Sequence, residues 1–210
     1  MFKSQLRDAI RQRPSRLYGK KQYLWCAGDK FSGLWLIKFG AVKTFYLNAN
    51  GDEQITGFYL PGEYIGLDEL PDECHRGYAK VIDECGIYHL SRTELSEFMD
   101  TGDERRHVYR MMSERLRLNK VRFRQLTRLS AGEKLAGFIY DLAVRYGFQG
   151  IVMRDFRLPM LRCDIANYIG VTPETVTREI IKLVDAGAFL FSGRQITELR
   201  PSVLVQLAGE

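Results

Sequence analysis

A long segment without helix breakers places the strongest constraint on the fold of this 210-residue chain. Neither glycine nor proline stands between Gly102 and Gly132. These two residue types most often end or kink a helix, so their absence predicts one helix over about 103–130. A helix of that length would be about 40 Å long and would outrun one small domain. That excess length favours pairing with a second helix over packing onto one small domain alone.

The residues of one helical face follow a heptad-like spacing. They are Val108, Met112, Leu116, Asn119, Phe123 and Leu126. This spacing is typical of a helix that pairs with a second helix, and a single Asn in such a seam fixes its register. Packing onto the chain's own preceding domain would bury the same face. We favour self-association and expect this face to be a dimer seam, which neutral Asn119 allows to form without an effector.

Short alternating segments precede the helix, from about residue 18 to residue 90. We expect strands at 23–26, 33–38, 41–47, 54–58, 78–81 and 86–90, with a turn at Phe39-Gly40. Many short strands separated by glycine turns predict a sandwich or a rolled barrel. The acidic stretch 62–84 contains Pro71, and we expect a short helix and a loop there. Ser91 and Glu94 form an S-x-x-E capping box, which predicts a helix start.

Composition and charge narrow the class of protein. The chain is 45% hydrophobic, which excludes a disordered or collagen-like chain. Residues 101–210 carry 18 basic and 12 acidic side chains, and a basic half favours a polyanionic partner. No apolar run approaches the ~20 residues of a membrane span, and the first residues lack a hydrophobic signal region. We expect a cytoplasmic protein without a membrane partner.

The most specific local pattern is RCDIANYIGVTPETVTR at 162–178. A helix-turn-helix needs a small residue where its helices cross, a glycine at the turn and a branched apolar residue in the second helix. Ala166, Gly170 and Val176 have these properties at spacings of four and six. We therefore expect a helix-turn-helix over about 162–181.

The second helix of this motif carries residues suited to reading bases. Thr172 is a good N-cap, and Pro173 is tolerated at the first helical position. Glu174 can accept a hydrogen bond from the cytosine amino group, and Arg178 can fork onto guanine. The methyl group of Thr177 can contact a thymine methyl. We expect these residues, with Pro173 on the leading face, to read DNA bases.

Phosphate contacts are expected around the motif. The candidates are Arg162, Thr172, Lys182, Ser192 and Arg194. Ser192 and Arg194 stand at the tip of an expected β-hairpin over 189–199, and such contacts position a protein on DNA without reading its sequence. Glu179 falls where an apolar contact is expected, and Ile180 is expected to supply that contact.

The chain resembles members of the CRP/FNR superfamily of bacterial transcription regulators, and more closely the fumarate-and-nitrate-reduction branch. The resemblance extends from about residue 17 to residue 209. Its most specific stretches are GDEQITGF at 51–58, AGFIY at 136–140 and the segment 164–178. It implies an α+β fold, with a β-roll sensor (a cyclic-nucleotide-binding-like jelly roll) at 1–100, a dimerisation helix at 101–130 and a winged helix-turn-helix at 131–210.

The resemblance also implies a target. Glu174, Thr177 and Arg178 would contact the bases of a palindrome related to TTGAT-N4-ATCAA. The protein would bind this double-stranded DNA as a homodimer, and it would recruit or block RNA polymerase.

The sensor is less constrained than the DNA reader. Iron–sulfur members of the branch place three cysteines in an N-terminal arm and a fourth in the β-roll, whereas the first cysteine here is Cys26 and only Cys85 stands near the fourth position. Cyclic-nucleotide binders use a Gly-Glu-Leu element and an Arg-Ser or Arg-Thr pair, whereas this chain has Gly66-Leu67-Asp68 and Arg76-Gly77. Gly66, Asp68 and Arg76 are therefore a weak candidate effector pocket.

Haem and thiol sensing stay open as alternatives. Cys74-His75 lies in the acidic stretch, and a lone loop histidine such as His75 is expected to be solvated. The other two histidines, His89 and His107, stand far from it in sequence, and we expect no bound metal. We expect no cofactor, neither iron–sulfur cluster nor haem nor cyclic AMP, and the small-molecule effector is unknown.

Two other classes of function compete with DNA binding. A cupin-type enzyme needs clustered metal ligands such as an H-x-H pair, which this sequence lacks, so we expect no enzyme. A ligand-binding adaptor that has lost DNA binding would not need the residues Glu174, Thr177 and Arg178. We therefore expect a DNA-binding regulator.

Overall fold

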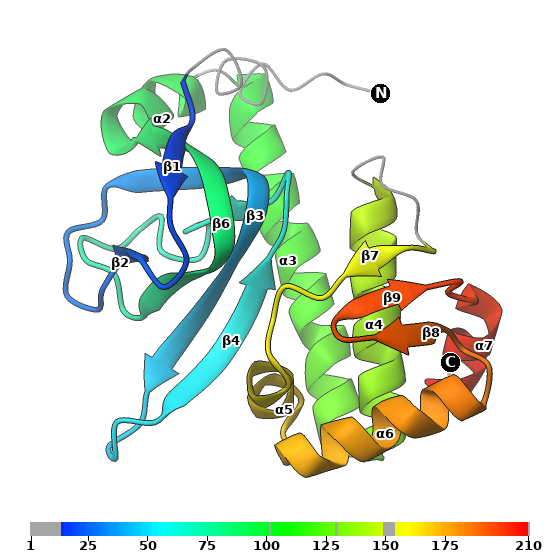
Figure 1. Ribbon diagram of the computed structural model, residues 1–210. Helices are drawn as coiled ribbons and strands as arrows, with labels where there is room; N and C mark the ends of the chain where they lie inside the picture. The colour runs from blue at the N-terminus through cyan, green and yellow to red at the C-terminus, as the bar shows by residue number, and fades with distance from the viewer. Residues whose placement is uncertain (1–13, 101, 129, 149–153, 210) are drawn as a thin grey trace. The chain divides into compact units, whose positions relative to one another are not determined.

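The computed structural model describes residues 14–100, 102–128, 130–148 and 154–209 (Figure 1). The chain divides into two compact units, Met1–Lys120 and Val121–Glu210. Each unit has its own sheet and its own core, so each is described by itself.

The first unit is built on six antiparallel strands. They are β1 (Arg16–Tyr18), β2 (Tyr23–Trp25), β3 (Gly33–Leu47), β4 (Glu53–Tyr59), β5 (Tyr64–Ile65) and β6 (Tyr78–Ser91). The order of the main path is β1-β6-β3-β4, while β2 pairs with β6 and β5 pairs with β3. The long strands β3 and β6 cross the centre of this sheet (Figure 1), which confirms the predicted β-roll.

Strand β3 corrects the expected turn at Phe39-Gly40. The strand continues through both residues, and its register against β6 shifts on either side of Phe39. Gly40 has φ +87°, and a Cβ there would lie 2.1 Å from the carbonyl oxygen of Glu84. The glycine therefore makes a β-bulge, which bends the strand without ending it. In the same way, the two strands expected at 78–81 and 86–90 are one strand, β6.

The acidic stretch after β5 also differs from the expectation. Residues 66–77 form turns and bends without a helix, and Lys30 and Cys74 form an isolated bridge. Pro71 lacks a backbone N–H and Gly66 has φ +92°, both of which oppose a helix in this short segment.

Alternating residues of β3 face two different cores. Trp35 and Ile37 belong to a cluster inside the roll. Leu34 and Leu36 belong to a second cluster, which also contains Leu95 of α2 (Arg92–Met99) and Val108 of α3 (Gly102–Arg128). The helices therefore cover the outer face of the sheet. Helix α2 begins as expected, because Ser91 and Glu94 form a capping box.

The second unit packs helices against a small sheet. Its elements are α4 (Ala131–Phe148), β7 (Phe156–Arg157), α5 (Arg162–Ile169), α6 (Pro173–Asp185), β8 (Leu190–Ser192), β9 (Gln195–Thr197) and α7 (Pro201–Leu207). The order of the strands is β7-β9-β8. Helix α4 packs against α5, α6 and α7, and its buried face includes Leu135, Ile139 and Leu142. This arrangement is the predicted winged helix-turn-helix.

Candidate nucleic-acid interface

The turn between α5 and α6 has the geometry that the sequence pattern predicts. Gly170 ends α5 in the left-handed region, with φ 71° and ψ 48°, and its N–H donates to the carbonyl of Ala166. The N–H of Val171 donates to the same oxygen at 3.0 Å. Ala166 is 1% exposed, so a larger side chain would push the two helices apart.

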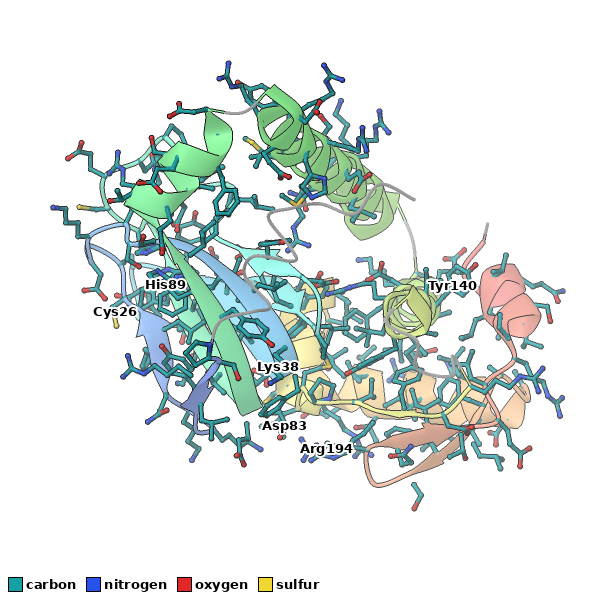
Figure 2. All side chains as sticks on the ribbon, turned by 90° about the horizontal axis from the view of Figure 1, so that it is seen from above. Cys26, Lys38, Asp83, His89, Tyr140 and Arg194 are labelled. Carbon is teal, nitrogen blue, oxygen red and sulfur yellow. The ribbon has the colours of Figure 1, made fainter. Side chains whose placement is uncertain are left out.

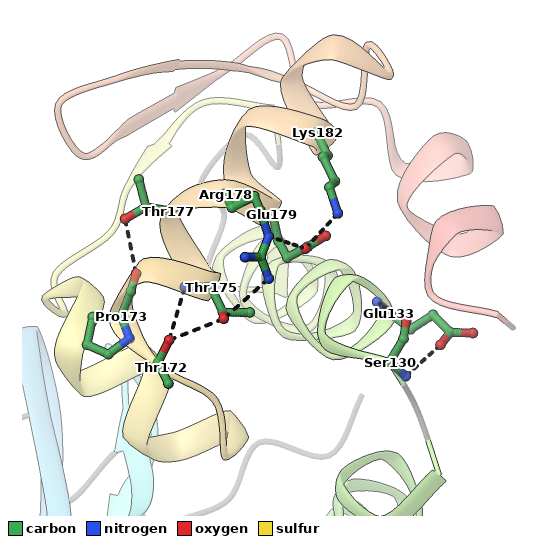
Figure 3. A network of polar contacts seen from close by, with 9 residues as sticks. All are labelled: Ser130, Glu133, Thr172, Pro173, Thr175, Thr177, Arg178, Glu179 and Lys182. Atoms are coloured by element: carbon green, nitrogen blue, oxygen red, sulfur yellow. Dashed lines mark hydrogen bonds and ion pairs between the residues drawn. The ribbon is translucent and has the colours of Figure 1, made fainter.

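Helix α6 begins with an open, capped N-terminus. The hydroxyl of Thr172 accepts a hydrogen bond from the N–H of Thr175 at 3.3 Å, and Pro173 occupies the first helical position. Both Thr172 and Pro173 are exposed. The first turn of α6 is therefore held by its own cap, which leaves its outer face available to a partner (Figure 3).

The expected base-reading residues share this face. The backbone N–H of Glu174 itself and the Thr172 hydroxyl hold the pKa of the Glu174 carboxyl below its usual range, so this group is an ionised acceptor at neutral pH. The hydroxyl of Thr177 donates to the carbonyl of Pro173 at 3.1 Å, which leaves its methyl group for apolar contact. The Arg178 side chain is 62% exposed.

Glu179 is the unexpected member of α6. It lies on the buried side of the helix with Val176, Ile180 and Leu183, and its side chain is only 10% exposed. Its Oε1 atom accepts from Nζ of Lys182 at 2.8 Å and lies 3.4 Å from Nε of Arg178 (Figure 3). Ile180 is buried as expected, but the buried carboxylate beside it was not predicted, because single-residue polarity does not reveal a local ion-pair partner.

The expected phosphate-binding residues around α6 differ in exposure and in the contacts that they already make. Arg162 and Ser192 are exposed, and the guanidinium of Arg162 lies 6.0 Å from the ring centre of Phe191, so the start of α5 lies beside strand β8. Arg194 lies in the turn between β8 and β9 (Figure 2). Its Nη1 donates to the carbonyl of Pro159 at 3.2 Å, so this side chain also fastens the wing to its own unit.

Helix α3 carries an exposed apolar stripe that differs from the expected seam. Val108 is 1% exposed and packs against the β-roll of its own chain, so it is unavailable to a partner helix. Met112, also expected in the seam, is half-buried and packs against the same cluster. Leu116 and Phe123 are 62% and 70% exposed, and Asn119 is exposed as well. Tyr109 is 57% exposed and stands seven residues before Leu116, a spacing that could have revealed it. The side chain of Leu126 lies outside the described part.

The candidate effector region is nearly filled by the chain itself. A cavity of about 20 Å³ is lined by residues that include Phe45, Tyr46, Asp68 and Tyr78. Phe45 and Tyr78 are stacked with their ring centres 5.1 Å apart. A space of this size holds about one water molecule, far less than a nucleotide.

Of the three expected pocket residues, only Asp68 lines this cavity. Asp68 lines the cavity, and desolvation by the surrounding protein raises the pKa of its carboxyl. Arg76 is not among the lining residues, because its Nη2 donates to Asp72 at 2.8 Å. Gly66 follows β5 and does not line the cavity either.

His75 corrects the expectation of a solvated loop histidine. It is 2% exposed and stacks on Trp25 with ring centres 4.2 Å apart. Its Nδ1 lies 2.5 Å from Oε2 of Glu69, while Oε1 of Glu69 accepts the N–H of Arg76 at 2.9 Å. The pair of His75 and Glu69 fastens the turns at 66–77 to the interior of the roll. No sequence motif predicts this pair.

Cys85, the cysteine near the expected fourth ligand position, is buried inside the β-roll. Burial raises the pKa of the Cys85 thiol to about 12, and its Sγ donates to the carbonyls of Ala41 and Asp83. Such a thiol stays protonated at neutral pH and is a poor nucleophile. Within the described ranges, no three His, Cys, Asp or Glu residues are grouped to hold a metal ion.

A second hollow opens beside β1, with a volume of about 480 Å³. Its lining includes Arg16, Tyr18, Trp35 and His89. The indole N–H of Trp35 is buried and has no hydrogen-bond partner among the residues that the structure describes. This hollow is separate in its lining from the small cavity at Asp68.

Together, an antiparallel β-roll, a long helix with an exposed apolar stripe and a winged helix-turn-helix define a DNA-binding transcription regulator with a sensor-like domain. Two family models agree with this class. Residues 15–102 match the cyclic nucleotide-binding domain, and residues 133–207 match the Crp-like helix-turn-helix domain.

Known proteins resemble the chain over most of its length. The fumarate nitrate reduction regulatory protein of Klebsiella oxytoca is 35% identical over 194 residues, which cover 91% of this chain and 77% of that protein. The fumarate and nitrate reduction regulatory protein of Escherichia coli strain K12 is 35% identical over 193 residues, covering 90% and 76%. This chain therefore belongs to the CRP/FNR family of transcription regulators, as the sequence motifs predicted, and its relatives are regulators.

Solved structures share the fold. The structure of FixK2 from Bradyrhizobium japonicum has a TM-score of 0.82 at 28% identity and covers 92% of this chain and 96% of that chain. TTHB099, a CRP-family regulator from Thermus thermophilus, has a TM-score of 0.72 at 18% identity, covering 93% and 97%. Among the described helices, none is both long enough and apolar enough to span a membrane.

Proposed function

We propose that this protein binds, as a homodimer, a palindrome resembling TTGAT-N4-ATCAA and regulates transcription from that site. The observation that carries the proposal is the capped, open N-terminus of α6, which presents Glu174, Thr177 and Arg178 on one accessible face. A recognition helix enters the major groove with its N-terminal residues leading.

The three side chains suit the proposed half-site. TTGAT contains one G·C pair, which offers guanine O6 and N7 as acceptors and the cytosine amino group as a donor. Arg178 forks onto the guanine, and the ionised carboxylate of Glu174 accepts from the cytosine. The methyl group of Thr177 contacts a thymine methyl, with Pro173 on the same leading face.

Contacts to the backbone position the helix in the groove. Arg162, Thr172, Lys182, Ser192 and Arg194 are proposed to bind phosphates. Lys182 and Arg194 must first leave Glu179 and the carbonyl of Pro159, respectively, or share their donors with the DNA. The wing and both helices of the motif thereby contribute to one interface.

The exposed stripe of α3 supports the proposed dimer. Tyr109, Leu116 and Phe123 are exposed and recur every seven residues, with exposed Asn119 between the last two, which is the spacing of a helix that pairs with a copy of itself. A two-fold dimer places two α6 helices so that each reads one half of a palindrome.

We further propose that dimerisation and DNA binding need no cofactor or cyclic nucleotide. The cavity of about 20 Å³ lined by Phe45, Tyr46, Asp68 and Tyr78 supports this, because it is far smaller than a nucleotide. RNA polymerase is the proposed protein partner, which the regulator recruits or blocks.

The proposal is tested by titrating the purified protein, without added small molecules, onto a fluorescent TTGAT-N4-ATCAA duplex and onto a duplex with scrambled half-sites. We expect at least 1,000-fold tighter binding to the palindrome, within the ordinary range of specific regulators. Sedimentation of the same complex should give two chains per duplex. Equal affinity for both duplexes would overturn the proposed palindrome, and binding to neither would leave a ligand-binding adaptor as the better account.

A further inference from the structure

Glu179 interrupts an otherwise apolar helix face at the centre of the DNA reader. Its neighbours on that face, Val176, Ile180 and Leu183, are at most 4% exposed, and Glu179 itself is 8% exposed. Buried carboxylates are rare unless they are paired, because removing a charge from water is costly. An apolar residue would pack at position 179 without this cost, so packing alone does not explain a glutamate there.

The partners of Glu179 are Arg178 and Lys182, two of the cations expected to contact DNA. Oε1 accepts from Nζ of Lys182 at 2.8 Å and lies 3.4 Å from Nε of Arg178. The hydrogen bond from Lys182 is also the largest cause that lowers the pKa of Glu179, so the carboxyl is ionised at neutral pH. Each cation is itself 62% exposed, so only the carboxylate is buried.

The other carboxylate oxygen of Glu179 lies against helix α4. Oε2 is 3.0 Å from the point where a Cβ on Gly132 would stand. Gly132 belongs to the first turn of α4, whose partial positive charge favours a carboxylate. Glu179 is therefore fixed from one side by the start of α4 and from the other side by Lys182 (Figure 3).

The contacts of Arg178 with its neighbours leave most of its guanidinium N–H donors available to DNA. An arginine side chain has five N–H donors, and the one on Nε faces Glu179. One donor on Nη2 binds the Thr175 hydroxyl at 3.4 Å. Three donors on Nη1 and Nη2 remain for guanine O6 and N7. The contacts with Glu179 and Thr175 therefore constrain the side chain and still leave donors for a bidentate contact to guanine.

We propose that Glu179 sets the DNA specificity of α6. Its buried carboxylate holds Arg178 in position to contact guanine, and it competes with DNA phosphates for Lys182. The competition weakens the sequence-independent part of binding, so the contacts of Arg178 decide a larger share of the affinity. This inference rests on the proposed function and adds a positioning residue to it. Phosphate contacts bind any sequence, whereas a fixed arginine fork discriminates between base pairs.

The test compares three variants of the full chain. Glu179→Gln removes the charge and keeps the shape. Gly132→Ala keeps the charge but displaces the carboxylate, and alanine favours the helix. Asp185→Asn is the matched control, because it removes one negative charge from an exposed residue of the same helix outside this network. Each variant is titrated onto the palindrome, onto a palindrome with its two G·C pairs changed to A·T, and onto random duplex at several salt concentrations.

We expect Glu179→Gln to bind random duplex about 3-fold more tightly than Asp185→Asn, with a salt slope steeper by about one unit, since one more phosphate contact forms. Discrimination between the G·C and A·T palindromes should fall about tenfold. Gly132→Ala should lose part of this discrimination at an unchanged net charge.

A purely structural role for Glu179 would lower the unfolding temperature of Glu179→Gln and leave both DNA readouts equal to those of Asp185→Asn, and this result would overturn the inference. If the wild type does not prefer the palindrome, the proposed function fails, while the slopes on random duplex still decide whether Glu179 restrains Lys182. A wild type that binds no duplex overturns both.

Discussion

At the scale of single residues, the proposed recognition of bases depends on a few side chains whose surroundings determine their ionisation and hydrogen bonding. Glu174 is an ionised acceptor because its own N–H and the Thr172 hydroxyl lower its pKa. Thr177 turns its hydroxyl to the carbonyl of Pro173. The sequence motif predicted which residues these are, but the states of their polar groups needed the structure.

Arg178→Ala tests the base-reading role directly. We expect a loss of about 1–3 kcal/mol in binding free energy on the palindrome, because a bidentate contact to guanine disappears. Binding to random duplex should change little, and fluorescence anisotropy on both duplexes measures the difference. Equal losses on the two duplexes would mean that Arg178 contacts only phosphate.

Cys85 provides a second test at this scale. Its thiol has a pKa raised to about 12 by burial, so it stays protonated at pH 8. Cys74 and Cys163 are exposed. Iodoacetamide at pH 8 should therefore alkylate Cys74 and Cys163 in the native protein and reach Cys85 only after unfolding, as mass spectrometry of peptides would show. Rapid native alkylation of Cys85 would refute the buried, inert thiol.

At the scale of elements, local sequence patterns predicted where most helices and strands occur, but they did not predict the exact ends of the strands. The capping boxes and N-caps at Ser91 and Thr172 predicted two helix starts correctly. The sequence predicts a turn at Gly40 where the structure has a bulge, because glycine permits both and only the pairing of β3 with β6 distinguishes them. The short strands β1, β5 and β7 escaped prediction, since two or three residues carry no period.

The two faces of α3 predict opposite outcomes for two substitutions. Leu116→Glu places a charge on the exposed stripe, so we expect the folded chain to become monomeric. Val108→Glu places the charge in the core shared with the β-roll, so it should destabilise the fold instead. Analytical ultracentrifugation and thermal unfolding separate the two results. A Leu116→Glu protein that stays dimeric would show that α3 is not the seam.

The DNA-binding unit should lose stability on acidification. The pKa values of Glu133, Glu174 and Glu179 are all lowered in the folded state, by contacts with Ser130, the Glu174 N–H and Lys182 respectively. Lowered pKa values contribute stability that is present above the unfolded value of about 4.3 and is lost as pH falls through the folded values.

Thermal unfolding from pH 8 to pH 3 measures this dependence. The unfolding temperature should be nearly flat above about pH 6 and fall below about pH 5. Below about pH 5, the unfolding temperature of Glu179→Gln should fall less steeply with decreasing pH than that of Asp185→Asn. An identical decrease in both variants would mean that the pKa of Glu179 does not change on folding.

At the scale of the whole molecule, the order of parts was predictable and the regulatory detail was not. The change from alternating segments to one unbroken helix and then to the pattern around Gly170 identified the fold class. The pairing of His75 with Glu69 and the filling of the cavity near Asp68 depend on residues distant in sequence, including Trp25 and Phe45. Tertiary packing decides such contacts, so single-sequence patterns do not contain them.

The central claim is that two copies of this chain read a two-fold palindrome through α6. Selection of bound duplexes from a random library by the purified protein, followed by sequencing, tests it most directly. The account predicts enrichment of a two-fold symmetric motif with TTGAT half-sites, and loss of the G·C preference in the Arg178→Ala variant. Enrichment of an asymmetric motif, or of no motif at all, would contradict it.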